Sequence, residues 1–312
     1  MQYLSPKMLA IAAEVSESSI KRWCDQGAIQ TVKTSGGHRR ITIASATEFL
    51  RRTGQMASAL LGVLPVNNLR SLDLVEVSQQ FLEAILAGEE EACRRLILNA
   101  HLEGEQASKI LDEVVAPAFR SIGTQWECNE VEVYQERHAC GICLRVMEEW
   151  RQTIPVPGER APLAIGGTVE MDPYSLPTAM VEIVLRQLGW HSRSLGSRLP
   201  FETLVAAVKD LKPDLIWLSV SHLDDERQFL EGYSEFYRSI DGLVPIVVGG
   251  RALTDSVRRQ MRYSCYCDNL QHLETFANTL YQARRRRASK SVRRSAKVSS
   301  LRKSSRQRVG SK

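Results

Sequence analysis

Apolar residues recur at two different spacings along this 312-residue chain, and the change of spacing divides it into regions. Between residues 72 and 153 they recur every three or four positions, which is the period of amphipathic helices. From residue 163 onward, continuous apolar runs such as 215–220 alternate with helical stretches. Runs of that kind are typical of parallel strands buried on both faces. The pattern predicts a helical domain followed by an α/β domain.

The helical region contains four periodic stretches joined by short connections that include glycine. Because short connections favour antiparallel neighbours, we expect a four-helix cap over residues 71–155. Its helices are expected at residues 72–86, 89–102, 105–126 and 131–153. The apolar faces of the first and third helices should include Val75, Phe81, Ile85, Ile110, Leu111, Val114, Val115 and Phe119.

The following region, residues 160–283, predicts a doubly wound α/β domain with a parallel sheet of about five strands. Strands are expected at residues 163–168, 192–195, 215–220, 244–248 and 264–268. Helices are expected at residues 176–188, 201–211, 225–240 and 270–283, with another after Gly250. Ligands of such folds lie beyond the carboxyl ends of the strands. Residues 166–176, 219–225 and 249–251 should therefore border a pocket.

The N-terminal region, residues 1–53, indicates a helix pair followed by a hairpin. Ser5 and Ser16 are suited to cap the two helices, and Gly27 is suited to end the second. A short turn near Glu14 gives the spacing of a helix-turn-helix. The apolar face of the first helix should comprise Met8, Leu9, Ile11 and Ala12.

A basic hairpin is predicted directly after this helix pair. A strand-like segment, residues 29–33, precedes two glycines that permit a tight turn, and a cationic run follows. The capping-box spacing of Ser45 and Glu48 predicts a third helix through Leu50. Hydroxyl and basic groups of the second helix, with the hairpin cations, can contact base edges and phosphates. The expected contacts to double-stranded DNA are Ser18, Ser19, Lys21, Arg22, Lys33, His38, Arg39 and Arg40.

This N-terminal region resembles the winged helix-turn-helix of excisionase and MerR-type DNA-binding modules. The resemblance is carried by Tyr3-Leu4-Ser5-Pro6, Val15-Ser16, Ile20-Lys21-Arg22-Trp23 and Gly36-Gly37-His38-Arg39-Arg40. It implies a helix in the major groove and a wing on the backbone or minor groove. The alternative is a small helical domain with a solvated basic loop. Because one such head contacts few base pairs, we expect a homo-oligomer on adjacent half-sites.

Composition narrows the class of protein. Hydrophobic residues make up 43% of the chain, and we find neither an apolar run of membrane-spanning length nor a signal peptide. The expectation is a cytoplasmic, nucleoid-associated protein without a membrane partner. Seven scattered cysteines fit reduced thiols, and the pair Cys140 and Cys143 lacks the second pair of a zinc site. No phosphate-binding loop, metalloprotease motif or useful carboxylate pair is present, so we expect no catalytic residue, no metal and no enzyme activity.

Charge is distributed very unevenly. The net charge is +5, yet residues 284–312 contain thirteen Lys and Arg and no acid, which leaves −8 for residues 1–283. This tail has too few large apolar residues to fold alone, so we expect a disordered extension. It can serve as a solvated tail, neutralise nucleic-acid phosphates, or dock on the acidic body. Residues 54–70 are expected to be a linker.

A second resemblance joins the cap to the α/β domain. Together they look like the two-part cobalamin-binding module of methionine synthase and corrinoid proteins. With the N-terminal head, the arrangement is similar to the CarH/CarA/LitR group of light- or cobalamin-responsive repressors. The cap carries it through Phe119, Gly123, Trp126, Val133, Glu136 and Ala139. The α/β half carries it through Leu185-Arg186-Gln187-Leu188-Gly189-Trp190, Leu195-Gly196, Pro200, Ser219-Val220-Ser221 and Gly249-Gly250.

The chain departs from this family at its metal ligands. The family places a cobalt-ligating His in an acidic-x-His-x-x-Gly loop, where this chain has Tyr174 and, for the glycine that gives the nucleotide tail room, Pro177. A neutral phenol is a poor cobalt ligand compared with imidazole. In the light-sensing members a cap His follows the Glu, where Arg137 stands here, and a permanently charged Arg cannot ligate a metal.

The resemblance therefore leaves three uses of the pocket open. It can be empty and act as a protein-interaction surface, hold another ligand, or hold cobalamin that keeps its own base on cobalt. Trp126 is either a lid or a plain core aromatic, and Glu136 with Arg137 is either a ligand contact or a solvated pair. The expected pocket residues are Trp126, Val133, Glu136, Arg137, Asp172, Tyr174, Ser219, Ser221, Gly249 and Gly250.

Taken together, the residues favour a DNA-binding transcriptional regulator whose C-terminal module senses a signal or binds a protein. The first alternative is a cobalamin-binding photoreceptor, or a corrinoid carrier that serves a methyltransferase, with base-on cobalamin. A further alternative is an adaptor whose α/β unit binds another regulator.

Overall fold

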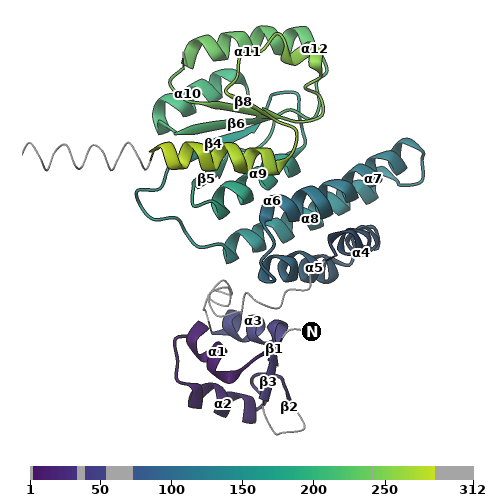
Figure 1. The fold of residues 1–312 in the computed structure, drawn as a ribbon. Coiled ribbons are helices and arrows are strands. Elements are labelled where there is room, and N and C mark those ends of the chain that lie inside the picture. Colours follow the sequence, from purple (N-terminus) through teal and green to yellow (C-terminus); the bar gives the residue numbers. More distant parts are fainter. Residues whose placement is uncertain (1–2, 34–38, 54–72, 241, 285–312) are drawn as a thin grey trace, which may run out of the picture. The chain divides into compact units, whose positions relative to one another are not determined.

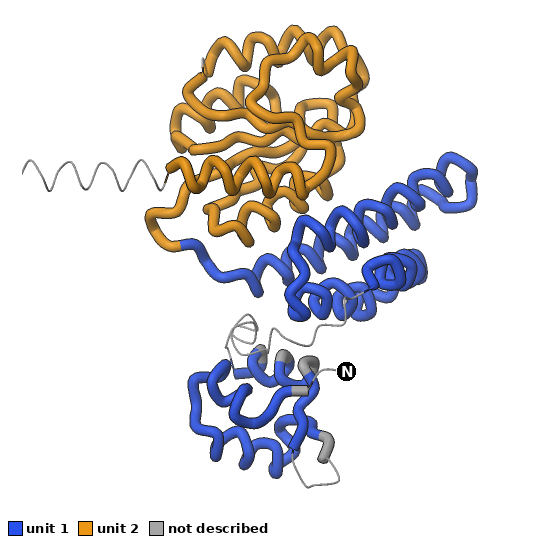
Figure 2. The backbone as a smooth tube through the Cα atoms, in the orientation of Figure 1, with its two compact units in different colours: residues 1–157 blue, residues 158–312 orange. Residues whose placement is uncertain are grey.

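The structure, a computed structural model, describes residues 3–33, 39–53, 73–240 and 242–284. The chain divides into two compact units, Met1–Pro157 and Gly158–Lys312 (Figure 2). The predicted linker, His38 with the turn glycines, and all of the basic tail beyond Arg284 lie outside the described residues. None of the described helices is long and apolar enough to cross a bilayer.

The N-terminal part of the first unit consists of three helices and a three-stranded antiparallel sheet of order β1-β3-β2 (Figure 1). The two predicted serine caps are confirmed: Ser5 Oγ accepts from the Met8 amide at 3.3 Å, and Ser16 Oγ accepts from Ser19 at 3.2 Å. Gly27 has a φ of +74° just beyond the second helix. The elements are β1 (Tyr3–Leu4), α1 (Pro6–Ala12), α2 (Glu17–Asp25), β2 (Thr31–Lys33), β3 (Arg39–Thr42) and α3 (Ile43–Arg52).

Two predictions about this part need correction, and one strand is additional. The third helix begins at Ile43 instead of Ser45, because Thr42 caps it: Thr42 Oγ1 accepts from the Ser45 amide at 3.1 Å. Ile11 is 60% exposed and is not part of the apolar face, whereas Leu9 is fully buried. The short strand β1 was not predicted, since two residues carry no periodic signal; it pairs with β3 and so closes the sheet over the core.

The cap helices agree with the predicted boundaries to within about two residues. They are α4 (Leu74–Leu86), α5 (Glu90–Leu102), α6 (Ala107–Ile110), α7 (Ala116–Glu127) and α8 (Val133–Thr153). The predicted third helix contains a π-helical turn, Leu111–Val115, between α6 and α7. Pro117 has no N–H to donate to the preceding turn, which accounts for the wider backbone there. Val75 is 68% exposed, so its predicted place in the core is wrong; Val77 is buried instead.

The second unit is a parallel five-stranded sheet with helices between its strands (Figure 1). The strand order is β5-β4-β6-β7-β8, and all neighbouring pairs are parallel, as predicted. The strands are β4 (Leu163–Thr168), β5 (His191–Ser194), β6 (Leu215–Ser219), β7 (Ile246–Gly249) and β8 (Cys265–Cys267). The helices are α9 (Ser175–Gln187), α10 (Phe201–Leu211), α11 (Glu226–Ile240), α12 (Asp255–Arg258) and a last helix over residues 270–284.

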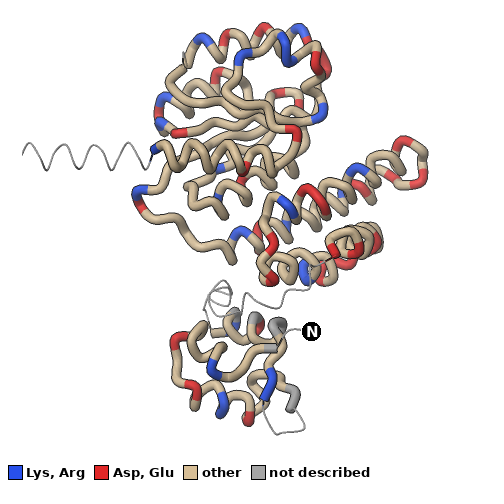
Figure 3. Tube along the Cα trace, in the orientation of Figure 1, with Lys and Arg blue, Asp and Glu red and all other residues tan. Residues whose placement is uncertain are grey.

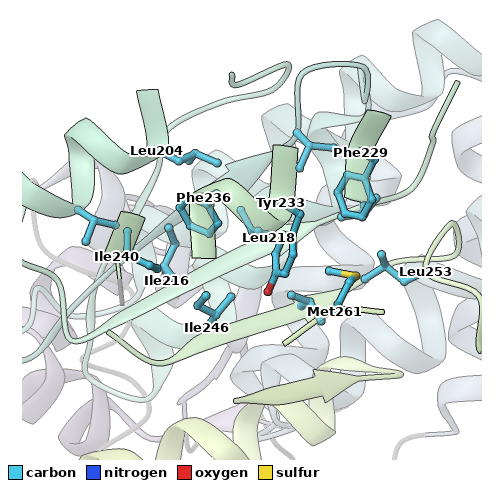
Figure 4. Packing of buried hydrophobic residues seen from close by; sticks show 14 of the residues in the cluster. Leu204, Ile216, Leu218, Phe229, Tyr233, Phe236, Ile240, Ile246, Leu253 and Met261 are labelled. Carbon is cyan, nitrogen blue, oxygen red and sulfur yellow. The ribbon is translucent and has the colours of Figure 1, made fainter. Parts of the chain in front are cut away.

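After β4, the chain adds β5 on one side of that strand and then β6, β7 and β8 on the other side. The loops that follow β4 and β6 therefore form the topological switch point of this parallel sheet. Every residue of β6 is buried, which explains why its sequence is a continuous apolar run. On one face of the sheet, Tyr233 and Phe236 of α11 pack on Ile216 and Leu218 (Figure 4). This core fixes the carboxyl ends of the strands, where the candidate pocket residues lie.

Candidate functional sites

The exposed side of α2 carries four of the predicted DNA contacts. Ser18, Lys21 and Arg22 are exposed, and Ser19 is half-buried. Lys21 Nζ lies 2.7 Å from Glu17 Oε1, and the hydroxyls of Ser18 and Ser19 lie 2.8 and 2.9 Å from Ser16 Oγ. Basic and acidic residues alternate along this helix (Figure 3). The surface is polar and hydrogen-bond capable, and its net charge is close to neutral.

The two arginines of the hairpin face opposite sides of β3. Arg39 lies on the same side as the buried Ile41, and its Nε and Nη2 donate to Asp25 Oδ1 at 3.1 and 2.7 Å. Arg40 is on the other side and is exposed. Lys33 pairs in register with Arg39. Arg39 and Arg40 therefore differ in the structure, because Arg39 is paired with Asp25 of α2 and Arg40 is exposed.

The cap candidates lie where α7 ends and α8 begins. Trp126 is 49% exposed and Val133 is 51% exposed, so Trp126 is not a plain core aromatic. Arg137 Nε lies 3.3 Å from Glu136 Oε2, and the Cys140 thiol donates to Glu136 Oε1 at 3.4 Å. Burial and the neighbouring carboxylate raise the pKa of Cys140 to about 12, so this thiol stays protonated at neutral pH. Glu136 and Arg137 thus form an ion pair near the start of α8.

In the α/β unit, Asp172 connects the two loops of the switch point. Its carboxylate is fully buried; Oδ1 accepts from the Tyr174 amide at 3.0 Å and Oδ2 accepts from the Ser221 amide at 2.5 Å. Burial raises the pKa of Asp172, and the hydrogen bonds from the backbone amides oppose that change. The side chain thus holds the loop after β4 against the loop after β6.

Arg251 covers the same junction from the third loop. Its Nε donates to the Ser221 carbonyl at 3.2 Å, and its guanidinium lies 5.6 Å from the centroid of the Tyr174 ring. Gly250 allows this approach, since its φ is +119° and a Cβ there would lie 2.2 Å from the Val220 carbonyl oxygen. The structure brings together Asp172, Tyr174, Ser221, Gly250 and Arg251, with Ser219 buried at the end of β6 and Gly249 half-buried at the end of β7.

The space between the sheet and the first turns of α9 is filled by Trp217. The indole is 1% exposed, and its Nε1 donates to Thr178 Oγ1 on α9 at 2.8 Å. It packs on the bare backbone of Gly166, where a Cβ would lie 2.3 Å from the indole ring. Sequence reasoning included Trp217 in a strand and Arg251 in a pocket rim but assigned neither a role. The sequence signal that could have indicated the role of Trp217 was a bulky aromatic residue in one strand opposite a glycine in the neighbouring strand.

Comparison with known proteins assigns both C-terminal parts to one kind of module. Residues 77–149 and residues 162–274 match two family models, each described as a B12 binding domain. Over 199 residues the chain is 21% identical to the dimethylamine corrinoid protein of Methanosarcina barkeri, covering 62% of this chain and 92% of that protein. The cap and the α/β sheet therefore form a B12-binding module in architecture.

Two further proteins are similar to this chain, one in sequence and one in structure. The chain is 28% identical over 144 residues to the HTH-type transcriptional repressor CarH of Myxococcus xanthus, which covers 46% of this chain and 48% of the repressor. The structure of the Methanosarcina barkeri monomethylamine corrinoid protein covers 66% of this chain and 98% of that chain with a TM-score of 0.54 at 18% identity. The second likeness is one of fold.

The residues present do not fit a cobalamin that takes a cobalt ligand from this chain. Tyr174 stands at the expected ligand position, its ring lies beside the Arg251 guanidinium, and the cap position holds the exposed Arg137. Within α9, which begins at Ser175, Pro177 stands where the resemblance expects the glycine that gives the nucleotide tail room, and the next residue, Thr178, accepts a hydrogen bond from the buried Trp217 indole at 2.8 Å. In the described part of the chain, no three His, Cys, Asp or Glu side chains are grouped to hold a metal ion.

Proposed function

We propose that this protein is a DNA-binding transcriptional regulator with an N-terminal winged helix-turn-helix. The observation that carries the proposal is the pair α1–α2 followed by an antiparallel hairpin, with the polar side of α2 and Arg40 exposed. A helix of this size fits the major groove, and a basic hairpin beside it suits the phosphates. The relative named a transcriptional repressor supports the same function.

In this proposal α2 is the recognition helix. Ser18, Lys21 and Arg22 contact base edges and phosphates, and Arg40 with Lys33 and His38 contacts the backbone along the hairpin. The thirteen cations of residues 284–312 add affinity for phosphates without reading sequence. Because one head buries too little surface for tight specific binding, two copies bind adjacent half-sites as a homo-oligomer. A protein with this role acts in the cytoplasm, on the nucleoid, and has no catalytic activity of its own.

The B12-type module is proposed to act as an assembly or protein-interaction unit that does not bind cobalamin through a protein His. The support comes from the contacts of three polar or aromatic side chains, each of which is hydrogen-bonded to another residue of the α/β unit: Asp172, Arg251 and Trp217. Coupling to a signal then requires a partner that binds one assembly state more tightly than another.

Selection of duplexes from a random library by the full-length chain tests the DNA-binding function. The expected result is an enriched sequence with two related half-sites, bound by an even number of copies in sedimentation. A library in which no duplex is enriched above the level given by bare beads contradicts the proposal. A protein lacking residues 285–312 separates specific selection from binding by the basic tail.

A second candidate is supported by the relatives named corrinoid proteins: the module holds cobalamin that keeps its own base on cobalt, as a photoreceptor or a carrier for a methyltransferase. The test is to mix the full-length chain with adenosylcobalamin in darkness, desalt it, and record the visible spectrum. We expect no corrin absorbance to remain. Retained absorbance supports this second candidate and excludes an empty module.

A further inference from the structure

The strand β3 and the helix α2 are joined by one ion pair whose geometry separates the roles of two adjacent arginines. Two nitrogens of Arg39 bond to a single oxygen of Asp25, at 3.1 and 2.7 Å, across fourteen residues of sequence. Arg39 is the first residue of β3, and Asp25 is the last residue of α2. The pair therefore connects the base of the hairpin to the carboxyl end of the helix.

The side of the strand on which each arginine lies decides what it can reach. Successive residues of a strand face opposite sides, so Arg39 shares a side with Ile41, which is fully buried. The Arg39 side chain is 27% exposed, and it is oriented toward the end of α2. Arg40 faces the other way, into solvent. Among the hydrogen bonds and ion pairs of the described residues, none involves the Arg40 side chain, so Arg40 can approach a phosphate without giving one up, whereas Arg39 would first have to leave Asp25.

Charge gives the pair a second effect. Asp25 is 54% exposed at the end of α2, and an uncompensated carboxylate there would repel a phosphate backbone. The guanidinium, which donates two hydrogen bonds to one oxygen of this carboxylate, neutralises its charge and fixes the distance between helix and hairpin at the same time. At the other end of α2, Lys21 compensates Glu17 in a similar way, but within one turn of the same helix.

We propose that Arg39 is a positioning residue, which sets the hairpin against α2 through Asp25, and that Arg40 is the arginine that contacts phosphate. This inference rests on the proposed DNA-binding function. It gives different roles to two adjacent residues of the basic run that are both expected DNA contacts, and it makes an acidic residue of α2, Asp25, a contributor to DNA affinity.

The test compares four full-length variants, Arg39→Gln, Asp25→Asn, the double variant and Arg40→Gln, on the duplex selected by the wild-type chain. Arg39→Gln and Asp25→Asn should each weaken binding by about twofold to fivefold, and the double variant no more than either. Their dependence of affinity on salt concentration should match the wild type. Arg40→Gln, the matched control, should lower the slope of that dependence by about one.

The contrary result is equally definite. If Arg39 contacts phosphate, Arg39→Gln lowers the salt slope as Arg40→Gln does, and Asp25→Asn binds as tightly as the wild type or more tightly because a repulsive charge is gone. Either observation overturns the proposal.

Hydrogen exchange in the free protein provides a readout that does not need DNA. The amides of β3 should exchange faster in Arg39→Gln and Asp25→Asn, by the same factor and without further change in the double variant, and should be unaffected in Arg40→Gln. If the wild-type chain binds no duplex, the proposed function fails, while exchange still decides whether the ion pair positions the hairpin. Unchanged exchange in both single variants overturns it.

Discussion

The N-terminal hairpin region and the switch-point loops of the α/β unit use polar side chains in opposite ways. Around α2 and β3, Ser18, Arg22 and Arg40 face solvent. At the switch point, Asp172 accepts from two loop amides and Arg251 donates to a loop carbonyl and covers a ring. A surface that binds a charged partner must keep its hydrogen-bond donors accessible to that partner. In the switch-point loops, these polar groups are already hydrogen-bonded within the unit.

The two regions should therefore respond differently to substitution. A substitution on the exposed side of α2 changes contacts with a partner and leaves folding nearly unaffected. A substitution at the switch point breaks hydrogen bonds or packing inside the fold. Asp172 and Gly250, which belong to the expected pocket, therefore make contacts that hold the loops of the α/β unit together.

The largest expected effect is at Gly250, where Gly250→Ala should destabilise the α/β unit by about 3–5 kcal/mol. The added Cβ would lie 2.2 Å from the Val220 carbonyl oxygen at a φ of +119°, so strain and a backbone clash combine. Urea unfolding monitored in the α/β unit measures the loss. Gly196→Ala is the matched control: its φ is +101° with nothing within 4 Å of the Cβ, so it should cost only about 1 kcal/mol. Equal losses would show that the clash is absent.

A buried group in the cap is expected to give the next largest effect, through pH. His101 is 5% exposed beside Trp150, with ring centroids 5.4 Å apart, and burial lowers its pKa to about 4. The unfolded chain takes up this proton near pH 6.5, so unfolding binds more protons between pH 6.5 and 4. Stability of the cap should thus fall by about 3 kcal/mol as pH drops through that interval.

The variant His101→Phe removes this titrating group and should flatten the pH dependence of cap unfolding between pH 6.5 and 4. The exposed His272 provides the control, and His272→Gln should leave the dependence as in the wild type. A His101→Phe protein that loses stability at low pH as steeply as the wild type would assign the effect to other groups.

At the switch point itself, Asp172→Ala should destabilise the α/β unit by about 2–3 kcal/mol, because the amides of Tyr174 and Ser221 lose a buried acceptor. Thermal unfolding of the full chain at neutral pH measures it. Asp224→Ala is a suitable control, since this carboxylate of the loop after β6 is exposed and contacts only His222 among the hydrogen bonds and ion pairs described. A loss as small as that of the control would mean that Asp172 does not hold the loops together.

Signals between neighbouring residues predicted most of the helices and strands. The remaining features depend on contacts between residues far apart in the sequence. Ser5, Ser16 and Gly27 predicted the first two helices because caps and left-handed ends depend on neighbouring residues alone. Val75 was misplaced because a periodic pattern with Val77 beside it leaves the helix face ambiguous by two positions. The two-residue β1 is too short for any period to be seen. The four-residue α12 lies where a helix is expected after Gly250, but so short a helix carries no period from which its bounds could be predicted.

The candidate sites were predictable in position more than in role. Strand ends located the loops that contain Asp172, Ser221 and Arg251, since parallel strands finish at one edge of a sheet. The pairing of Arg39 with Asp25 could not be derived, because it depends on how far β3 lies from α2. Likewise, Trp217 was recognisable as a strand residue, but only the bare backbone of Gly166 shows which space the indole fills.

The smallest change in stability, and the clearest contrast with the switch point, is expected on α2. Arg22→Gln removes an exposed cation from the proposed recognition helix and should change the free energy of unfolding by less than about 0.5 kcal/mol. It should nevertheless weaken binding to the selected duplex and lower the salt slope by about one. Lys209→Gln on α10 removes an equally exposed cation far along the chain and should change neither quantity. If both variants bind like the wild type, α2 does not read DNA, and the outward-facing surface must serve another partner.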